Sequence, residues 1–327
     1  MNQLVDRFGR AHSYLRISVT DRCNLRCVYC MPAEGIPLKA KNEILTLEEI
    51  VRVANVFVEM GIRKIRLTGG EPLVRKNLEY VIAELGKNPL VECLEMTTNA
   101  VLLADKIDTL KAGGLTHLNI SLDSLNAEKF KKITLRDDHA RVMGAIERAE
   151  QAGFQSIKIN VVVIAGTNDD EVLDFVHWAK DKRVNVRFIE YMPFKDNDWK
   201  LDGVCSYADM RKRIEEQFEL QQLPGSTGDV AKDFQIRGHQ GTVSFVTSMT
   251  DSFCATCNRL RLTADGGIKS CLFFAPEVNL RDNLREGATD ADIRAMITEA
   301  VLGKPEAHPP MDELANAENR AMVEIGG

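Results

Sequence analysis

Three cysteines lie close together near the start of the chain, within the segment SVTDRCNLRCVYCMP. They are Cys23, Cys27 and Cys30, separated by three and then by two residues. Thiolates at such spacing hold 4Fe–4S clusters, which normally take four of them. Because this loop has no fourth cysteine, one iron would keep an open position, where a further molecule can bind. The alternative is a zinc site or a set of buried thiols, but zinc would need a fourth ligand and His12 is badly spaced.

A second group of three cysteines lies in FCATCNRLRLTADGGIKSCLF. Cys254 and Cys257 are two residues apart, and Cys271 follows after a gap of hairpin length. The residues TADGG are typical of a tight turn, so a hairpin is expected to bring Cys271 back beside the other two. Alone, this pattern fits zinc as well as iron–sulfur. In a chain that also carries the first group, it favours a second 4Fe–4S cluster with its own open iron.

The composition agrees with a metal-binding enzyme. The chain has 327 residues, of which 44% are hydrophobic, enough for one large domain or two. It has no long apolar run, and its start MNQLVDRFGR has no hydrophobic signal region, so we expect a soluble, cytoplasmic protein without membrane contact. Its eight cysteines favour metal ligands over disulfides. The net charge of −6 gives no sign of a nucleic-acid surface, so an anionic substrate must be gathered by a local cluster of positive charge.

Strand and helix patterns alternate over the first two-thirds of the chain, which predicts a parallel α/β sheet. About six such units predict an incomplete (β/α)6 TIM-like barrel rather than a closed barrel of eight. We expect residues 1–200 to form this partial barrel, and residues 201–327 to form a C-terminal α+β region that carries the second cluster and closes the barrel mouth. The expected helices include one opened by Thr46 and Glu49, and others at 138–152 and 169–181. The expected strands are 15–19, 65–68, 93–98, 117–121, 157–163 and 186–191.

Polar residues alternate with apolar ones along these strands, whereas parallel strands buried on both faces are almost continuously apolar. Arg16, Arg66 and Lys158 stand in this way on three different strands. The apolar set packs on the helices, so the polar set must face the barrel lumen. A buried unpaired cation costs several kcal/mol, so the three predict a bound anion such as phosphate. The alternative places them at strand ends, paired with Asp or Glu.

The loop after the second strand reads TGGEP, from Thr68 to Pro72. Its two glycines let the backbone approach a ligand closely, and its free N–H and C=O groups can bind an ammonium or amide group. By itself it would be an ordinary tight turn. The chain has no GxxxxGK[ST] motif, so a nucleotide here is not held by a phosphate-binding P-loop.

Together, SVTDRCNLRCVYCMP, RLTGGEP, TTNA, NISLDS, CATCNRLRLTADG and the terminal IGG resemble the GTP 3′,8-cyclase (MoaA) family of radical S-adenosylmethionine (SAM) enzymes. The similarity covers nearly the whole chain, and the second cysteine group with NRLRLTADG is its specific part. The resemblance implies that Cys23, Cys27 and Cys30 ligate the cluster that binds SAM. It implies that Cys254, Cys257 and Cys271 ligate a second cluster facing the guanine. The implied SAM contacts are Tyr29, Gly70, Ser121 and Met192. The implied GTP contacts are Arg16, Arg66, Thr97, Lys158, Arg259, Leu260 and Arg261.

The resemblance also implies a reaction and partners. A lyase would convert GTP to (8S)-3′,8-cyclo-7,8-dihydroguanosine 5′-triphosphate, the first step of molybdopterin (molybdenum cofactor) biosynthesis. In that reaction SAM is cleaved to methionine and a 5′-deoxyadenosyl radical, which takes hydrogen from C3′ of GTP before C3′ attacks C8. No catalytic side chain is implied beyond the cofactors. The implied partners are an electron donor of the flavodoxin or ferredoxin type, a second copy in a homodimer, and the cyclic pyranopterin monophosphate synthase that receives the product.

The chain ends in EIGG. Gly326 and Gly327 can thread a narrow space without steric cost, and the resemblance implies that this tail enters the active site. A frayed terminus is the alternative. Two other functions stay open: another radical SAM enzyme with an auxiliary cluster, such as a peptide-modifying one, and a non-catalytic iron–sulfur or zinc protein acting as sensor or electron carrier. The cationic lumen argues against a peptide, and a carrier would leave that lumen unexplained.

Overall fold

Six parallel strands form the centre of the computed structural model, which describes residues 3–225, 228–251, 253–274, 278–310, 313–314 and 320–326. They pair in chain order, as the alternation of strands and helices predicts. All six predicted strands are confirmed, and their bounds differ by no more than one residue from those expected. The strands are β3 (Tyr14–Ser18), β4 (Lys64–Thr68), β5 (Cys93–Thr98), β6 (His117–Ser121), β7 (Ser156–Val163) and β8 (Asn185–Glu190).

The C-terminal part of the chain adds strands to both edges of this sheet. β12 (Arg259–Leu262) runs parallel to β3, and β11 (Thr242–Val246) runs parallel to β8. Beyond them lie β13 (Gly267–Lys269), β14 (Val278–Asn279), β10 (Ala231–Ile236) and β9 (Leu220–Gln222). The order of the twelve strands is open, from β14 to β9, and no pairing among the described residues closes it into a barrel. The fold is therefore a mixed α/β sheet, with β1 (Leu4–Val5) and β2 (Ala11–His12) in a separate pair.

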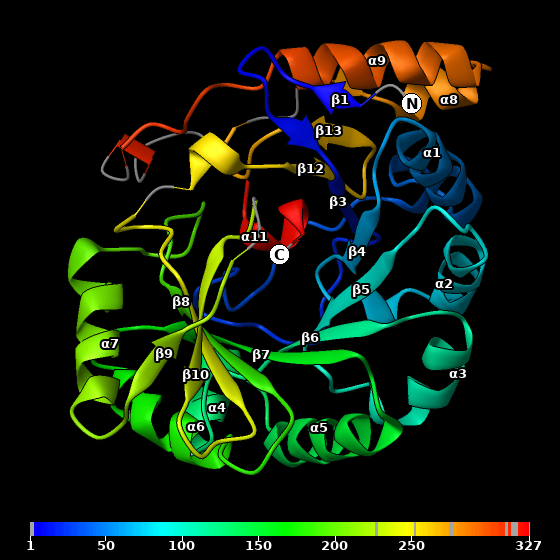
Figure 1. Cartoon of the computed structure of the whole chain (residues 1–327). Coiled ribbons are helices and arrows are strands. Elements are labelled where there is room, and N and C mark those ends of the chain that lie inside the picture. The colour runs from blue at the N-terminus through cyan, green and yellow to red at the C-terminus, as the bar shows by residue number, and fades with distance from the viewer. Residues whose placement is uncertain are drawn as a thin grey trace.

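Helices lie outside the curved sheet (Figure 1). The capping box of Thr46 and Glu49 is confirmed at the start of the first helix, and Gly153 ends the fifth in the left-handed conformation. The first six are α1 (Leu47–Glu59), α2 (Leu78–Gly86), α3 (Ile107–Ala112), α4 (Ala127–Thr134), α5 (His139–Ala152) and α6 (Val172–Trp178). The C-terminal helices are α7 (Tyr207–Glu215), α8 (Arg281–Arg285), α9 (Asp290–Leu302) and α11 (Met322–Ile325).

The helix predicted at 169–181 is shorter than expected. A 3-10 turn occupies Asp169–Glu171, and α6 covers only Val172–Trp178. The backbone N–H of Ile164 donates to Asn168 Oδ1 (2.8 Å) and that of Gly166 donates to Asp169 Oδ1 (2.7 Å). These side chains accept hydrogen bonds from backbone N–H groups of the loop before the helix. Such local hydrogen bonds compete with those of a helix.

The alternation along the strands is confirmed by burial. Ile17, Leu67 and Ile159 are fully buried in one continuous apolar core that also includes residues of the surrounding helices. Arg16 and Arg66, on the same strands, line an internal cavity instead. None of the helices in the described ranges combines the length and apolarity that a membrane-spanning helix requires.

Candidate active site

The first cysteine loop follows β3 and lines a large cavity inside the curve of the sheet. The N–H of Cys30 donates to the carbonyl of Cys27 (2.9 Å), which folds the loop tightly. All three thiols are partly buried, and those of Cys23 and Cys30 lie close enough to Cys27 to interact electrostatically. Burial raises the pKa of Cys23 to about 11 and that of Cys30 to about 12. A bound metal would therefore have to supply the positive charge that keeps these groups as thiolates.

The TGGEP segment is packed against this loop. The N–H of Gly70 donates to Thr20 O (2.8 Å), and that of Glu71 donates to Arg22 O (2.8 Å). A Cβ on Gly70 would lie 2.3 Å from Arg22 O, so only glycine fits. The buried Glu71 accepts from Thr98 Oγ1 (2.7 Å) and from the N–H of Asn99 (2.7 Å). Glu71 thus joins the ends of β4 and β5 at the loop, a role that sequence reasoning missed.

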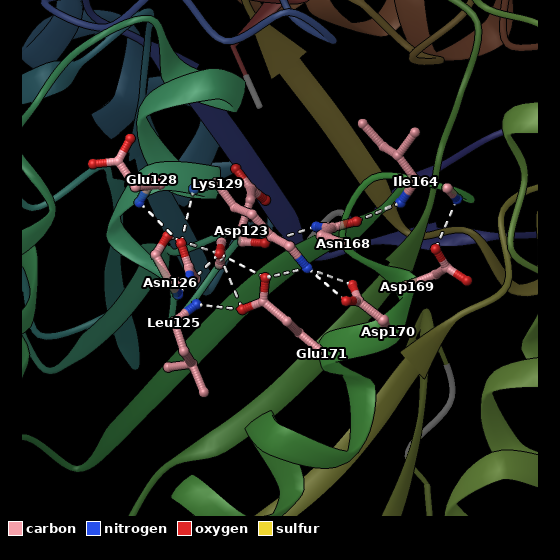
Figure 2. Close-up of polar contacts among 12 residues, drawn as sticks. Asp123, Leu125, Asn126, Glu128, Lys129, Ile164, Asn168, Asp169, Asp170 and Glu171 are labelled. Carbon is pink, nitrogen blue, oxygen red and sulfur yellow. Dashed lines mark hydrogen bonds and ion pairs between the residues drawn. The ribbon is translucent and has the colours of Figure 1, made fainter.

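Tyr29 ties the same loop to the ends of β6 and β7. Its hydroxyl donates to Asp123 Oδ2 (2.8 Å), and the N–H of Val162 donates to Asp123 Oδ1 (2.9 Å). Burial raises the pKa of Asp123 to about 6, although both hydrogen bonds lower it. Figure 2 shows the contacts behind Asp123, where Asn168 Nδ2 donates to the Asp123 carbonyl (2.7 Å) and the N–H of Leu125 donates to Glu171 (2.7 Å). This network fixes the strand ends that face the cavity.

The cavity encloses about 1370 Å³ of empty space, counting its open mouth. All four predicted SAM contacts and the three cysteines of the first group line it, together with most of the predicted GTP contacts. The predicted residues along its wall are Cys23, Cys27, Cys30, Tyr29, Gly70, Ser121, Met192, Arg16, Arg66, Thr97, Arg259 and Arg261. The structure therefore brings together residues that the sequence separates by more than 200 positions.

Several buried polar atoms along this wall have no hydrogen-bond partner. They are Arg16 Nε, Thr97 Oγ1, Asn160 Oδ1, Arg187 Nε and Ser248 Oγ. A buried polar group without a partner costs about 1–3 kcal/mol. Their donor and acceptor types fit a polar ligand such as SAM or a nucleotide, which would satisfy them on binding.

A second cavity of about 590 Å³ shares part of its lining with the first and is strongly cationic. Arg16, Arg66 and Arg259 line both cavities, and Lys158 lines the second. Burial lowers the pKa of Lys158 to about 8 and that of Arg16 to about 10. Crowded cations of this kind fit a polyanion.

Sequence reasoning missed two further cations of this cavity, Lys64 and Arg187. Lys64 stands two residues before Arg66 on β4, and Arg187 stands between apolar Val186 and Phe188 on β8. The alternation that identified Lys158 would have identified both.

Arg66 is also paired with a carboxylate, so the alternative left open for it holds in part. Its Nη2 lies 2.5 Å from Glu95 Oε2, and Lys64 pairs with the same side chain. Glu95 is fully buried. Although burial works in the other direction, Arg66 and Lys64 hold the pKa of Glu95 far below its usual value. Because one carboxylate offsets only part of the charge, the cavity keeps an excess of cations.

We expect Glu95→Gln to lower the free energy of unfolding by about 3–5 kcal/mol, because it leaves buried cations without their counter-charge. Chemical denaturation of the apo-protein measures the change. The control is Glu84→Gln, since Glu84 forms an exposed pair with Lys87 that contributes about 0–1 kcal/mol. Equal stabilities of the two variants would contradict this role of Glu95.

The second cysteine group lies beside the β12–β13 hairpin, as predicted. Cys254 and Cys257 lie close enough to Cys271 to interact electrostatically with it. Arg259 Nη2 donates to Cys257 Sγ (3.3 Å). Burial alone would raise the pKa of Cys257, but Arg259 and Lys304 hold it at about 6. Cys257 therefore favours the thiolate form more than Cys23 and Cys30 do, whereas burial raises the pKa of Cys271.

Among the described residues, no three His, Cys, Asp or Glu side chains converge closely enough to hold one metal ion. A 4Fe–4S cube needs another arrangement, because each of its thiolates binds a different iron. Three thiols on one short loop, beside a cradle at Gly70 that a Cβ would fill, fit a cube of this kind.

The C-terminal tail lies inside the curve of the sheet, where Figure 1 shows α11 in red. Arg261 Nη1 donates to the carbonyl of Gly326 (2.5 Å), and Met322 lines the large cavity. A Cβ on Gly326 would lie 2.5 Å from Thr68 Oγ1. Gly327 lies outside the described residues. Leu260 differs from its neighbours, since its side chain is buried in the core, so a contact with GTP would have to come from its backbone.

Two family models match the chain. The model of the radical SAM superfamily matches residues 17–179, and the model described as Molybdenum Cofactor Synthesis C matches residues 184–310. The first range contains the first cysteine group, and the second contains the other.

The fold is shared with SuiB of Streptococcus suis. The structure of SuiB bound to its precursor peptide SuiA matches with a TM-score of 0.63, over 96% of this chain and 75% of that chain. SuiB bound to S-adenosylmethionine matches with a TM-score of 0.60, over 88% and 69%. The sequence identities are 15% and 14%, so these matches show a common fold alone.

Closer relatives identify the family. The mitochondrial GTP 3′,8-cyclase of Arabidopsis thaliana is 49% identical, over 100% of this chain and 84% of that protein. The GTP 3′,8-cyclase of Syntrophomonas wolfei is 42% identical, over 99% of this chain and 100% of that protein. Molybdenum cofactor biosynthesis protein 1 of Homo sapiens is 46% identical, and the chain spans about half (51%) of its length. The chain belongs to the GTP 3′,8-cyclase family of radical SAM enzymes, which confirms the resemblance drawn from its motifs.

Proposed function

We propose that this enzyme converts GTP to (8S)-3′,8-cyclo-7,8-dihydroguanosine 5′-triphosphate, the first step of molybdenum cofactor biosynthesis. The observation that carries the proposal is a cavity lined by the first cysteine group that shares Arg16, Arg66 and Arg259 with a strongly cationic cavity. The second cysteine group lies beside the same Arg259, whose Nη2 donates to Cys257 Sγ. The cofactors of this family are 4Fe–4S clusters and SAM. The unpaired polar atoms and the Gly70 cradle support their fit to this chain.

In the proposed site, Cys23, Cys27 and Cys30 hold the first cluster, and Cys254, Cys257 and Cys271 hold the second. Tyr29, Gly70, Ser121 and Met192 surround SAM. Arg16, Arg66, Thr97, Lys158, Arg259, Leu260 and Arg261 contact GTP. Lys64 and Arg187 join them as phosphate ligands, because they line the same cationic cavity.

The first cluster and SAM, when bound, supply the 5′-deoxyadenosyl radical that abstracts hydrogen from the ribose of GTP. The chain's own residues have to place the reacting groups in contact beforehand, because such a radical attacks almost any neighbour. The cations of the second cavity fix the triphosphate, and the half-buried Tyr29 and Ser121 line the wall of the first cavity. Charge-assisted hydrogen bonds to phosphate are strong and directional, which makes them suitable for this positioning.

We further propose that the six parallel strands form an incomplete (β/α)6 TIM-like barrel over residues 1–200, and that residues 201–327 close its mouth. The pairing of β12 with β3 and of β11 with β8 supports this arrangement. The electron donor of the flavodoxin or ferredoxin type, the homodimer, the hand-over to cyclic pyranopterin monophosphate synthase and the cytoplasmic location remain part of the proposal.

The activity itself can be tested with protein reconstituted with iron and sulfide without air. After addition of SAM and dithionite, we expect 5′-deoxyadenosine to form only when GTP is present, together with a cyclised GTP product. Formation of 5′-deoxyadenosine that does not depend on GTP would point instead to another radical SAM reaction. If SAM stays intact under strong reductant, the result would favour a non-catalytic iron–sulfur protein.

We expect Lys158→Met to weaken GTP binding by about 10- to 100-fold, because a charge-assisted hydrogen bond is worth about 1.5–3 kcal/mol. Guanosine, which has no phosphates, should bind almost as well as before. Equilibrium binding of GTP and of guanosine to the reconstituted protein measures the difference. Lys212→Met, on the exposed face of α7, is the control. An equal loss for GTP and guanosine would show that Lys158 does not contact phosphate.

The tail can be tested at Gly326, which has a positive φ of 84° and no room for a Cβ. We expect Gly326→Ala to displace the tail from Arg261 and to reduce GTP conversion by at least about tenfold. Gly144→Ala is the matched control, since a Cβ there would meet nothing within 4 Å. The rate of product formation and the iron content should be measured together. Unchanged conversion with both clusters intact would refute a role of the tail, and deletion of Gly326 and Gly327 gives a second test.

A further inference from the structure

A buried lysine lies directly behind the second cysteine group. Lys304 follows α9, and only 4% of its surface is exposed. Its Nζ donates to the carbonyl of Arg259 (3.0 Å) and to the carbonyl of Cys257 (3.3 Å), and lies 3.4 Å from Cys257 Sγ. An ammonium group has three hydrogens to donate, so these three atoms account for all of them.

Such burial requires a counter-charge, because lysine is almost never fully buried without one. Two of the three partners of Lys304 are neutral carbonyl groups. Of these three partners only the sulfur of Cys257 can carry a negative charge, which it would have as a metal-bound thiolate. The position of Lys304 therefore fits a cluster ligand at Cys257.

The surroundings of the two cysteine groups differ in charge. Cys257 receives donors from two cations, Lys304 and Arg259. In the first group, Cys23 has an amide donor, Asn99 Nδ2 at 3.8 Å, and Cys27 lies near the carboxyl group of Asp123. Arg26 also lies near Cys23, but its Nη1 donates to the Cys23 carbonyl and not to the sulfur. A cluster bound at Cys257 would thus meet cationic donors at its ligand sulfur, whereas no hydrogen bond from a cation to a sulfur of the first group is found among the described residues.

The backbone around Lys304 is fixed by another buried cation. Arg10 Nη1 donates to the carbonyl of Cys254 (2.8 Å) and to that of Glu306 (2.7 Å), and its Nη2 donates to the carbonyl of Pro305 (2.6 Å). Its Nε is held by Asp6 Oδ2 (2.6 Å). Arg10 thereby binds the segment after Lys304 to the cysteine loop and holds the backbone from which the Lys304 side chain reaches Cys257.

We propose that Lys304 is a positioning residue of the second 4Fe–4S cluster, which orients Cys257 and raises the reduction potential of that cluster. The proposal rests on the proposed function only in assuming that the second cysteine group holds a cluster. Hydrogen bonds to ligand sulfur and nearby positive charge stabilise the reduced cluster, which carries one more negative charge. Loss of Lys304 should therefore make the cluster harder to reduce.

The test is a redox titration of the second cluster alone, in the full-length chain carrying Cys23→Ala, Cys27→Ala and Cys30→Ala. Dithionite supplies one electron per cluster, and the paramagnetic resonance of the reduced cluster reports its occupancy. Iron and sulfide are counted in each sample. In this background we compare Lys304→Met, Lys304→Gln and Lys304→Arg, with Lys212→Met on α7 as the control for loss of a surface charge.

We expect Lys304→Met and Lys304→Gln to shift the midpoint potential to more negative values while the cluster is retained. Lys304→Arg, which keeps the charge and the donors, should titrate close to the unsubstituted protein, and so should Lys212→Met. A merely structural role of Lys304 would not move the potential of a fully occupied cluster. If Lys304→Met fails to hold iron, the milder Lys304→Gln decides the question.

Retained clusters in Lys304→Met and Lys304→Gln that titrate at the unsubstituted potential would overturn the inference. A shift of the same size in Lys212→Met would overturn it as well, because the effect would then be one of net charge. Failure of the underlying assumption looks different, since in that case the protein with an intact Lys304 would itself contain no second cluster.

Discussion

Replacement of Cys27 by alanine is expected to abolish SAM cleavage. Cys27 is the middle one of the three proposed ligands in the sequence, and its thiol lies close enough to those of Cys23 and Cys30 to interact electrostatically. A cube that loses one of three thiolates has two incompletely held irons, so we expect no first cluster to remain. Iron should fall by about half, from about eight to about four atoms per chain. Production of 5′-deoxyadenosine with dithionite and SAM should fall below detection.

The matched control is Cys205→Ala, a buried cysteine of the core that lines neither cavity. We expect it to keep both clusters and most of the activity. A Cys27→Ala protein that holds the full iron content and still releases 5′-deoxyadenosine would show that the first loop is not the site of SAM cleavage.

Cys271→Ala is expected to remove the function of the second cysteine group while leaving that of the first group intact. Cys271 lies beside Cys254 and Cys257, beyond the β12–β13 hairpin. Its loss should remove the second cluster and with it the conversion of GTP, while the first loop keeps about half of the iron. Binding of SAM, measured by equilibrium dialysis without air, should stay near that of the unsubstituted protein. Cyclised product at an undiminished rate would contradict the role given to the second group.

The parts of the fold that depend on local pattern could be predicted well. The six central strands follow from apolar and polar alternation, and the start of α1 follows from the capping box at Thr46. The helix at 169–181 was predicted too long, because side-chain bonds from Asn168 and Asp169 to the preceding loop are not visible in an apolar period.

The site residues could be predicted where their chemistry depends on the spacing of residues in the sequence. The spacing of the cysteines identified both groups, and the alternation along the strands identified Arg16, Arg66 and Lys158 as residues that line a cavity. Lys64 and Arg187 carried the same signal and were missed. The pairing of Arg66 with Glu95 joins two neighbouring strands, and only the register that places these residues opposite each other reveals it.

Lys304 and Glu71 show what sequence cannot supply. Lys304 is a single lysine after a helix, a position that is ordinarily exposed to solvent. Its burial depends on the N-terminal residues around Arg10 and on the cysteine loop, which meet only in the folded chain. Glu71 belongs to the TGGEP segment, yet its hydrogen bonds with Thr98 and Asn99 depend on the pairing of β4 with β5.

The proposed function requires two cubes, each held by three thiolates. Mössbauer spectroscopy of ⁵⁷Fe-reconstituted protein, combined with iron, sulfide and zinc analysis, shows whether both are present. We expect two 4Fe–4S clusters per chain, with altered spectra at one iron of the first cluster after addition of SAM and at one iron of the second after addition of GTP. A protein that contains zinc in place of iron, or a single cluster only, would contradict the proposed function.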